Sequence, residues 1–189
     1  MCIRDRTISQ IERKKGIKRT IQYRPDGNDF VCVNGKNRYT RALYGGITDF
    51  RIETSDRPVF ATYKPKDSKH ICFRLQCGNQ SIALDSLKFC EARYRAGRRT
   101  YRLTDPLLGK GELNISVLAF PDAEGGIWRF TMKDMPEGAL LHCYISEIRA
   151  KNLSRNGDMG ADRADSFDAP QLPKEQKHYK LSLDGTTAY

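Results

Sequence analysis

The sequence has no run of apolar residues approaching the roughly 20 that a membrane-spanning helix requires. It also lacks the motifs GxSxG, HExxH and GxxxxGK followed by Ser or Thr, which mark serine hydrolases, zinc hydrolases and phosphate-binding loops. Its three histidines, His70, His142 and His178, are scattered along the chain. These absences exclude a membrane helix and the common sequence signatures of catalysis.

Cysteine forms no regular metal or disulfide pattern. Six cysteines are present, but there is no CxxC pair. Cys2 lies in the first six residues, which are interpreted below as non-native, and the other five are an odd number that cannot all form disulfides with one another. Cys72 and Cys77 lie five residues apart, which places them on opposite faces of one strand. We therefore expect reduced cysteines that pack as small hydrophobic residues. The sequence predicts no metal and no cofactor.

The positive charge is concentrated near the N-terminus. The net charge of +10 would suggest a nucleic-acid ligand, but residues 1–20 contain seven Lys or Arg and two acidic residues, a local excess of +5. The other 169 residues carry the remaining +5, which is typical of a solvated surface. With 39% hydrophobic and 30% charged residues, the composition predicts one globular domain.

Apolar and polar residues alternate with the period of a β-strand. Trp128, Phe130 and Met132 share one face of residues 127–133, opposite three polar side chains. The same alternation occurs in residues 49–55, 70–77 and 112–116. Such strands belong to a sheet with one dry and one wet face. In residues 139–149 both faces carry apolar groups, which predicts a central strand buried on both sides.

Turn signals separate these strands. Asn34-Gly35 and Ala96-Gly97 each lie between two strand-like runs and predict hairpins, and Asp26-Gly27 predicts a further turn. About ten to twelve short strands at this spacing are typical of an all-β protein. We expect an antiparallel β-sandwich, of supersandwich-like type, with one long polar loop.

The long polar loop covers about residues 151–174 and contains NLSRNGDMGADRADSF, residues 152–167. Loops of this length are uncommon in compact domains and are usually functional, disordered or docked on another body. Its aspartates do not follow the register of an EF-hand, which argues against calcium. Arg155, Asn156 and Asp158 have the planar polar groups that suit sugar hydroxyls. The alternative is a loop whose aspartates only stabilise turns.

Three further candidate sites stay open at this level. Trp128 is either a sugar-stacking platform or, as its alternation favours, a core residue. The hairpin ARYRAGRRTYR, residues 92–102, is either a nucleic-acid or polysaccharide site or an exposed charged face, which alternation favours. Carboxylates such as Glu147, Asp158 and Asp162 would form a glycosidase pair only if the fold brought them to the required separation.

Four long phrases resemble one family. They are IKRTIQYRPDGNDFVCVNGKNRYTRALYGG, TDFRIETSDRPVFATY, EARYRAGRRTYRLTDPLLGKGELNISVLAF and LSRNGDMGADRADSFDAP. The chain resembles domain-of-unknown-function family 4450, the N-terminal β-domain of large exported proteins in polysaccharide-degrading gut anaerobes. The resemblance covers nearly everything after about residue 16. It implies that a catalytic domain of six-hairpin glycosidase type follows, and it assigns no catalytic residue within the β-domain.

The resemblance and the termini set the expected organisation. MCIRDR looks like translated sequencing-adapter DNA, so residues 1–16 are interpreted as a non-native or disordered leader, with residues 1–6 as the artefact. Residues 17–189 are expected to be a single β-sandwich domain, truncated at its C-terminus. The parent protein would be periplasmic or secreted.

The expected function is that of a non-catalytic domain of a glycoside hydrolase that acts in polysaccharide degradation. Its partners would be the missing catalytic domain and an oligo- or polysaccharide, with no nucleic acid. We predict that the loop residues Arg155, Asn156, Asp158 and Asp162 lie near the substrate or dock on that domain. The alternatives are a stand-alone carbohydrate-binding module that uses Tyr39, Tyr44 or Tyr94, and a basic nucleic-acid-binding domain.

Overall fold

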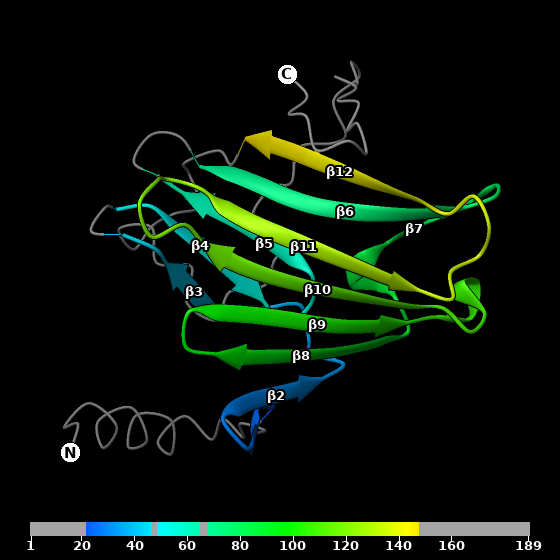
Figure 1. The fold of residues 1–189 in the computed structure, drawn as a ribbon, viewed down its shortest axis with the longest axis horizontal. Coiled ribbons are helices and arrows are strands. Elements are labelled where there is room, and N and C mark those ends of the chain that lie inside the picture. Colours follow the sequence, from blue (N-terminus) through cyan, green and yellow to red (C-terminus); the bar gives the residue numbers. More distant parts are fainter. Residues whose placement is uncertain (1–21, 47–48, 65–67, 148–189) are drawn as a thin grey trace, which may run out of the picture.

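The computed structural model describes residues 22–46, 49–64 and 68–147, which form twelve strands and two short 3-10 helices (Figure 1). The strands are β1 (Arg24–Asp26), β2 (Asp29–Val33), β3 (Tyr39–Tyr44), β4 (Arg51–Ser55), β5 (Val59–Tyr63), β6 (Lys69–Cys77), β7 (Gln80–Ala83), β8 (Phe89–Arg95), β9 (Arg98–Thr104), β10 (Glu112–Ala119), β11 (Gly126–Lys133) and β12 (Leu140–Glu147). The 3-10 helices are η1 (Leu84–Ser86) and η2 (Pro106–Leu108).

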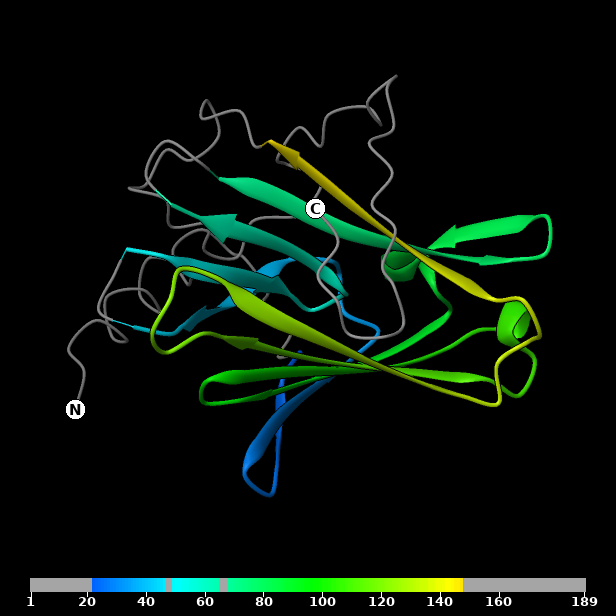
Figure 2. The ribbon, with the colours of Figure 1, turned by 45° about the horizontal axis from the view of Figure 1, so that its top comes forward.

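The strands form two antiparallel sheets. Sheet I has the order β1-β2-β8-β9-β10-β11, and sheet II has the order β12-β6-β5-β4-β3, with β7 beside the second half of β6. The two sheets lie one on the other, and Figure 2 shows them as two layers. The predicted antiparallel β-sandwich is therefore confirmed.

Alternation along the strands builds the core between the sheets. In sheet I the buried residues Leu113, Ile115 and Val117 of β10 alternate with polar neighbours. In sheet II, Ile71, Phe73 and Leu75 of β6 do the same. Aromatic edge-to-face contacts join the layers. The ring centre of Phe60 in sheet II lies 5.6 Å from that of Tyr101 and 5.8 Å from that of Trp128, both in sheet I. The period-two pattern in the sequence predicted this dry face correctly.

Two of the three predicted turns are confirmed. Ala96-Gly97 joins β8 to β9, where Arg95 pairs with Arg98, and Gly97 has φ +79°. Asp26 pairs with Asp29 across the turn that contains Gly27. The left-handed backbone at both positions is the reason that glycine is needed there.

The hairpin predicted at Asn34-Gly35 is wrong, because β2 and β3 belong to different sheets. The Asn34 side chain accepts a hydrogen bond from the Cys90 backbone N–H and keeps this segment on sheet I. Asp56, directly after β4, then accepts hydrogen bonds from the backbone N–H groups of Lys36 and Arg38. Residues 34–38 therefore cross from one sheet to the other, and side-chain contacts far away in sequence decide the path.

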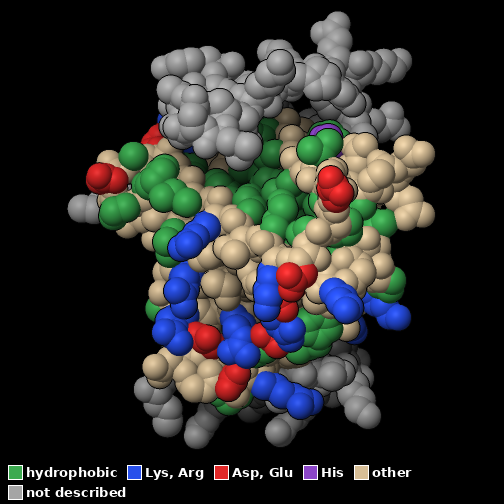
Figure 3. All heavy atoms as spheres, turned by 45° about the vertical axis from the view of Figure 1, so that its right-hand side comes forward, with side chains coloured by type: hydrophobic (Ala, Val, Ile, Leu, Met, Phe, Trp, Pro, Cys, Tyr) green, Lys and Arg blue, Asp and Glu red, His purple; other side chains and the backbone are tan. Residues whose placement is uncertain are grey.

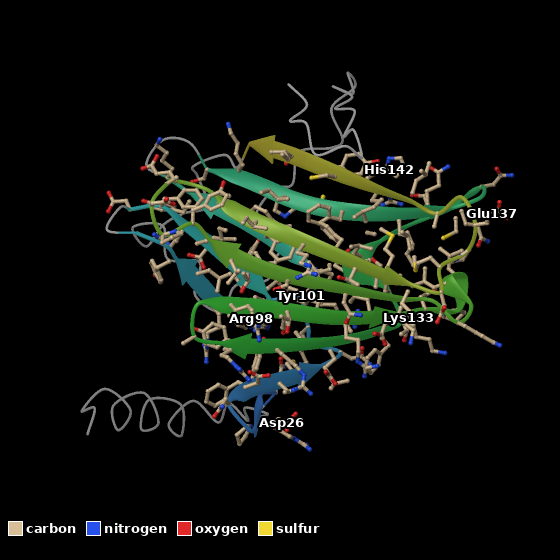
Figure 4. All side chains as sticks on the ribbon, viewed as in Figure 1. Asp26, Arg98, Tyr101, Lys133, Glu137 and His142 are labelled. Atoms are coloured by element: carbon tan, nitrogen blue, oxygen red, sulfur yellow. The ribbon has the colours of Figure 1, made fainter. Side chains whose placement is uncertain are left out.

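A buried polar contact joins the two sheets. The Ser55 carbonyl oxygen of β4 accepts hydrogen bonds from the Arg99 guanidinium at 2.9 Å and from the Tyr101 hydroxyl at 2.7 Å. Arg99 also donates to the hydroxyls of Tyr23 and Tyr101. The side chains of Arg99 and Tyr101 are buried on the core face of β9, and Figure 4 places Tyr101 in the middle of sheet I. Arg99 thus departs from the exposed charged face expected for the hairpin arginines.

Glycine allows a close approach at one corner of the sandwich. A Cβ atom on Gly45, just after β3, would lie 1.6 Å from the backbone oxygen of Phe120, which follows β10. A Cβ atom on Gly126, at the start of β11, would lie 2.2 Å from Ile52 of β4. The two sheets therefore meet at this corner with the backbone of Gly45 against that of Phe120, and with the backbone of Gly126 against the Ile52 side chain.

We expect Tyr101→Phe to lower the free energy of unfolding by about 2 kcal/mol. The substitution keeps the ring in the core but removes the donor to Ser55 and the acceptor for Arg99, which leaves a buried guanidinium less satisfied. Urea unfolding measures the change. Tyr44→Phe, at a hydroxyl on an exposed side chain, is the control and should shift stability by less than about 0.5 kcal/mol. Equal effects of the two variants would contradict the role of the buried contact.

We expect Gly45→Ala to lower the free energy of unfolding by about 3 kcal/mol, because the neighbouring atom is backbone and cannot move aside alone. Gly78→Ala is the comparison, since it has open space around a Cβ and only the strain of φ +57°, worth about 1–2 kcal/mol. Thermal unfolding of both variants checks the order. A smaller loss for Gly45→Ala than for Gly78→Ala would show that the corner is not tightly packed.

Candidate interaction surfaces

The loop residues predicted from the sequence, Arg155, Asn156, Asp158 and Asp162, lie outside the described residues. Their role near a substrate or a partner domain stays a prediction. The same holds for the leader at residues 1–16 and for the end of the domain at residue 189. The described residues present three other surfaces, and the sequence had indicated the second of them, which includes the arginines of the hairpin at residues 92–102.

The first surface is an apolar shelf on sheet II. Residues that pair directly across two antiparallel strands share a face, and Leu141, Cys143 and Ile145 of β12 pair with the core-facing residues of β6. The core face of sheet II thus continues onto β12. We define the apolar shelf as Leu141, Cys143 and Ile145 of β12 together with Met132 of β11. Met132 also lies on the core-facing side of its strand.

The apolar shelf is open among the described residues. The side chain of Ile145 is 57% exposed and that of Met132 is 41% exposed, and Cys143 is also exposed. In Figure 3, hydrophobic side chains gather on a hollowed face above a band of charged ones. The prediction that residues 139–149 form a central strand is wrong for the described part, because β12 ends the strand order of sheet II.

The second surface is the outer face of sheet I, where charges of both signs are paired. Arg93 contacts Glu91 at 2.8 Å and Asp26 at 2.9 Å, and Arg95 contacts Asp29 at 2.6 Å. Arg102 contacts Glu112 at 3.4 Å. The expected exposed charged face is confirmed for these arginines. Because carboxylates already neutralise them, they offer little free positive charge to a polyanion.

Pairing also lowers the pKa of acidic groups on this face. Hydrogen bonds, first from Arg95, hold the pKa of Asp29 below its ordinary value. Asn114 and then Arg102 lower the pKa of Glu112. A glycosidase general acid needs the opposite, a carboxyl group whose pKa is raised. These two carboxylates therefore act as structural partners of arginine and amide groups.

The third surface is the outer face of sheet II, which is more buried than alternation predicts. Glu53 was expected on a wet face, but it is 5% exposed, and the Arg51 side chain donates a hydrogen bond to it at 2.6 Å. The Arg51 guanidinium also lies 3.9 Å from the centre of the Tyr63 ring. His70 of β6 is 6% exposed, and its Nε2 atom has no hydrogen-bond partner. Around Glu53 and His70 this face is therefore buried, although Tyr44 of β3 is exposed on it.

Most of the aromatic residues considered for sugar stacking are buried or in contact with other side chains of the domain. Trp128 packs on Phe60, as the core interpretation predicted. Tyr39 is buried, and Tyr94 lies under the Arg41 guanidinium at 5.4 Å. Tyr44, 65% exposed, is the one of the three candidate tyrosines that presents an open ring. A single exposed tyrosine gives limited support to a carbohydrate-binding module.

The cysteines of the described part are free thiols. Cys32 and Cys90 are buried, and burial raises the pKa of Cys90 to about 12, as expected for cysteines that pack as small hydrophobic residues. Cys72 and Cys77 lie on opposite faces of β6, as their spacing predicted. Cys143 is the exception, because it is exposed on the apolar shelf.

Within residues 22–46, 49–64 and 68–147, no three His, Cys, Asp or Glu side chains gather as a metal site would require. No helix in the same ranges has the length and apolar character needed to cross a membrane.

Comparison with protein-family models matches residues 65–186 to the domain of unknown function DUF4450. The match covers 122 of the 189 residues, counted from 65 to 186 inclusive. The chain belongs to this family. No curated protein and no solved structure matches it. The DUF4450 match includes β6–β12, the apolar shelf and the predicted loop residues, so the shelf and the loop belong to one matched unit.

We expect the stability of the DUF4450 domain to fall as the pH drops below about 6.5, the ordinary pKa of histidine. Burial lowers the pKa of His70, against the charge of Asp85. The unfolded chain then binds the proton more readily, so this stability is present above pH 6.5 and is lost below it. The loss is at most about 1.4 kcal/mol per pH unit.

Urea unfolding between pH 7 and pH 5 measures this dependence. His70→Gln should flatten the profile over that range, whereas His142→Gln, on β12, should retain it because His70 is still present. An unchanged profile in His70→Gln would assign the dependence to other groups.

Proposed function

We propose that this chain is the non-catalytic β-sandwich domain of an exported, periplasmic or secreted glycoside hydrolase that acts in polysaccharide degradation. The family membership supports the proposal, since the family phrases in the sequence resemble N-terminal domains that precede six-hairpin catalytic domains. In this proposal the reaction takes place in that following domain. The DUF4450 domain contributes the loop with Arg155, Asn156, Asp158 and Asp162.

The observation that carries the non-catalytic assignment is the use of carboxylates in structural contacts. On sheet I, Asp29 and Glu112 have lowered pKa values. Asp56, which follows β4 of sheet II, and Asp105, which follows β9, each accept hydrogen bonds from two backbone N–H groups. A glycosidase pair needs one protonated carboxyl and one free carboxylate across a sugar. These four carboxylates instead stabilise strands and turns through hydrogen bonds and ion pairs.

The loop is where the proposal places contact with the substrate or the catalytic domain. Between β12 and the end of the DUF4450 match, the planar polar side chains of the sequence include Arg155 and Asn156, and several aspartates lie nearby in sequence. Such groups bind sugar hydroxyls with fixed donor and acceptor geometry. A β-domain packed beside a catalytic domain can supply them to the edge of its cleft.

Turnover of a polysaccharide by the parent protein tests the proposal. We expect Arg155→Ala with Asp158→Ala to reduce turnover about tenfold or more, the effect of losing one to two polar contacts in the transition state. The matched control is Arg163→Ala with Asp165→Ala, which removes the same residue types outside residues 155–162 and should leave turnover near that of the parent. The 189-residue chain alone should show no hydrolysis. Unchanged turnover and stability in the first variant would refute the role of the loop, and hydrolysis by the isolated chain would refute the non-catalytic assignment.

A further inference from the structure

The free edge of β12 differs from the other outer edges of the two sheets. Natural sheet edges are commonly protected from pairing by short strands, proline, bulges or charged residues. Among the described strands, β1 has three residues and contains Pro25, and β3 has a bulge between Tyr39 and Arg41. β11 carries Arg129 and Lys133. Each of these edges has a feature that opposes the addition of a strand.

Of these protections β12 has only one charged residue, Glu147, at its last position. Its eight residues pair with β6 in continuous register, from Leu140 opposite Gln76 to Glu147 opposite Lys69. It contains no proline, lysine or arginine. No described strand pairs with its other edge. The backbone N–H and C=O groups on that edge can therefore accept another strand.

The apolar shelf specifies the side chains of such a strand. Successive residues of a strand point to opposite faces, so every second side chain would lie beside Cys143 and Ile145. Those positions need to be apolar in order to cover the shelf, and the positions between them need to be polar. The free edge and the apolar shelf therefore predict one sequence pattern.

We propose that residues 178–183 of this same chain, HYKLSL, pair with the free edge of β12. These residues lie outside the described ones, and the sequence carries the assignment. Tyr179, Leu181 and Leu183 alternate with Lys180 and Ser182. Within residues 150–189 no other stretch has three large apolar residues at alternate positions. The DUF4450 match continues to residue 186, so the segment belongs to the same matched unit as β12.

This pairing adds to the proposed function by anchoring the polar loop. Its consequence for that loop rests on the proposed function. Two antiparallel neighbouring strands bring the end of one beside the start of the other. Residues 148–177 would then leave and re-enter the sandwich at the Glu147 end of β12, close to Lys69 of β6. The polar residues from Arg155 to Asp162 would be presented as one loop with both ends anchored.

A cysteine scan in the 189-residue chain tests the pairing, because Cys143 is a native probe on the shelf. Directly opposed residues of antiparallel strands have Cα atoms about 4.5–5.5 Å apart, within the range of a disulfide, about 4.4–6.8 Å. Cysteine replaces Tyr179, Leu181 and Leu183 in three variants, and Lys180 and Ser182 in two matched controls. Mild oxidation, followed by non-reducing electrophoresis and peptide mapping, identifies the disulfides.

We expect an intramolecular disulfide to Cys143 in at least one of the three apolar variants and in neither control, and its loss when Cys143→Ser is added. Disulfides at all five positions, or at none, would overturn the proposal. A cross-linked product of twice the mass would instead place a second copy on the edge and would also overturn it.

A second measurement serves if the cysteine variants do not fold. Alkylation of Cys143 by a maleimide, located by peptide mapping, should be faster in the 189-residue chain with Leu181→Ser and Leu183→Ser than in the parent 189-residue chain, because the shelf is uncovered. Equal rates would overturn the proposal. Neither result depends on sugar turnover, so this inference and the proposed function can fail separately.

Discussion

The arrangement of the two sheets depends on one buried contact, the Ser55 carbonyl that accepts hydrogen bonds from Arg99 and Tyr101. The main-chain ladders run within each sheet and do not fix one sheet against the other. Apolar side chains pack the layers together, but apolar contacts are not directional. A buried guanidinium is costly unless its donors meet acceptors, and here Nε and Nη2 of Arg99 do so, whereas Nη1 is buried without a partner. This contact therefore defines which residues of β4 lie opposite β9.

Arginine suits this position better than lysine would. Its planar group holds several N–H donors in a fixed geometry, and here they reach the Tyr23 hydroxyl, the Tyr101 hydroxyl and the Ser55 carbonyl. Tyr23 precedes β1, Tyr101 is on β9 and Ser55 ends β4. One side chain thus joins three segments from both sheets. Asp56 extends the same junction, because it binds the segment that crosses from β2 to β3.

The strands were predictable from the sequence because their periodicity is a local property. Residues 127–133 needed only the alternation of Trp128, Phe130 and Met132 to be assigned to a strand with a dry face. Pairing partners are not local, and the predictions failed there. Asn34-Gly35 has the composition of a hairpin turn, but contacts with Cys90 and Asp56 send the chain to the other sheet. Arg99 is buried for the same reason, since its acceptors come from distant segments.

The same distinction between local pattern and distant contacts applies to the candidate sites. Composition indicated a charged hairpin, but it could not show that carboxylates from β1, β2 and β10 neutralise the arginines. Both faces of residues 139–149 carry apolar groups, and from this pattern alone the sequence predicts a central strand. Among the described strands β12 has a neighbour on one side only. Its composition is that of a central strand, whereas its position is that of an edge strand, and an added strand would remove this difference. The predicted burial of β12 and its observed free edge agree if residues 178–183 occupy that edge. The same sequence pattern then accounts for both the strand and its partner.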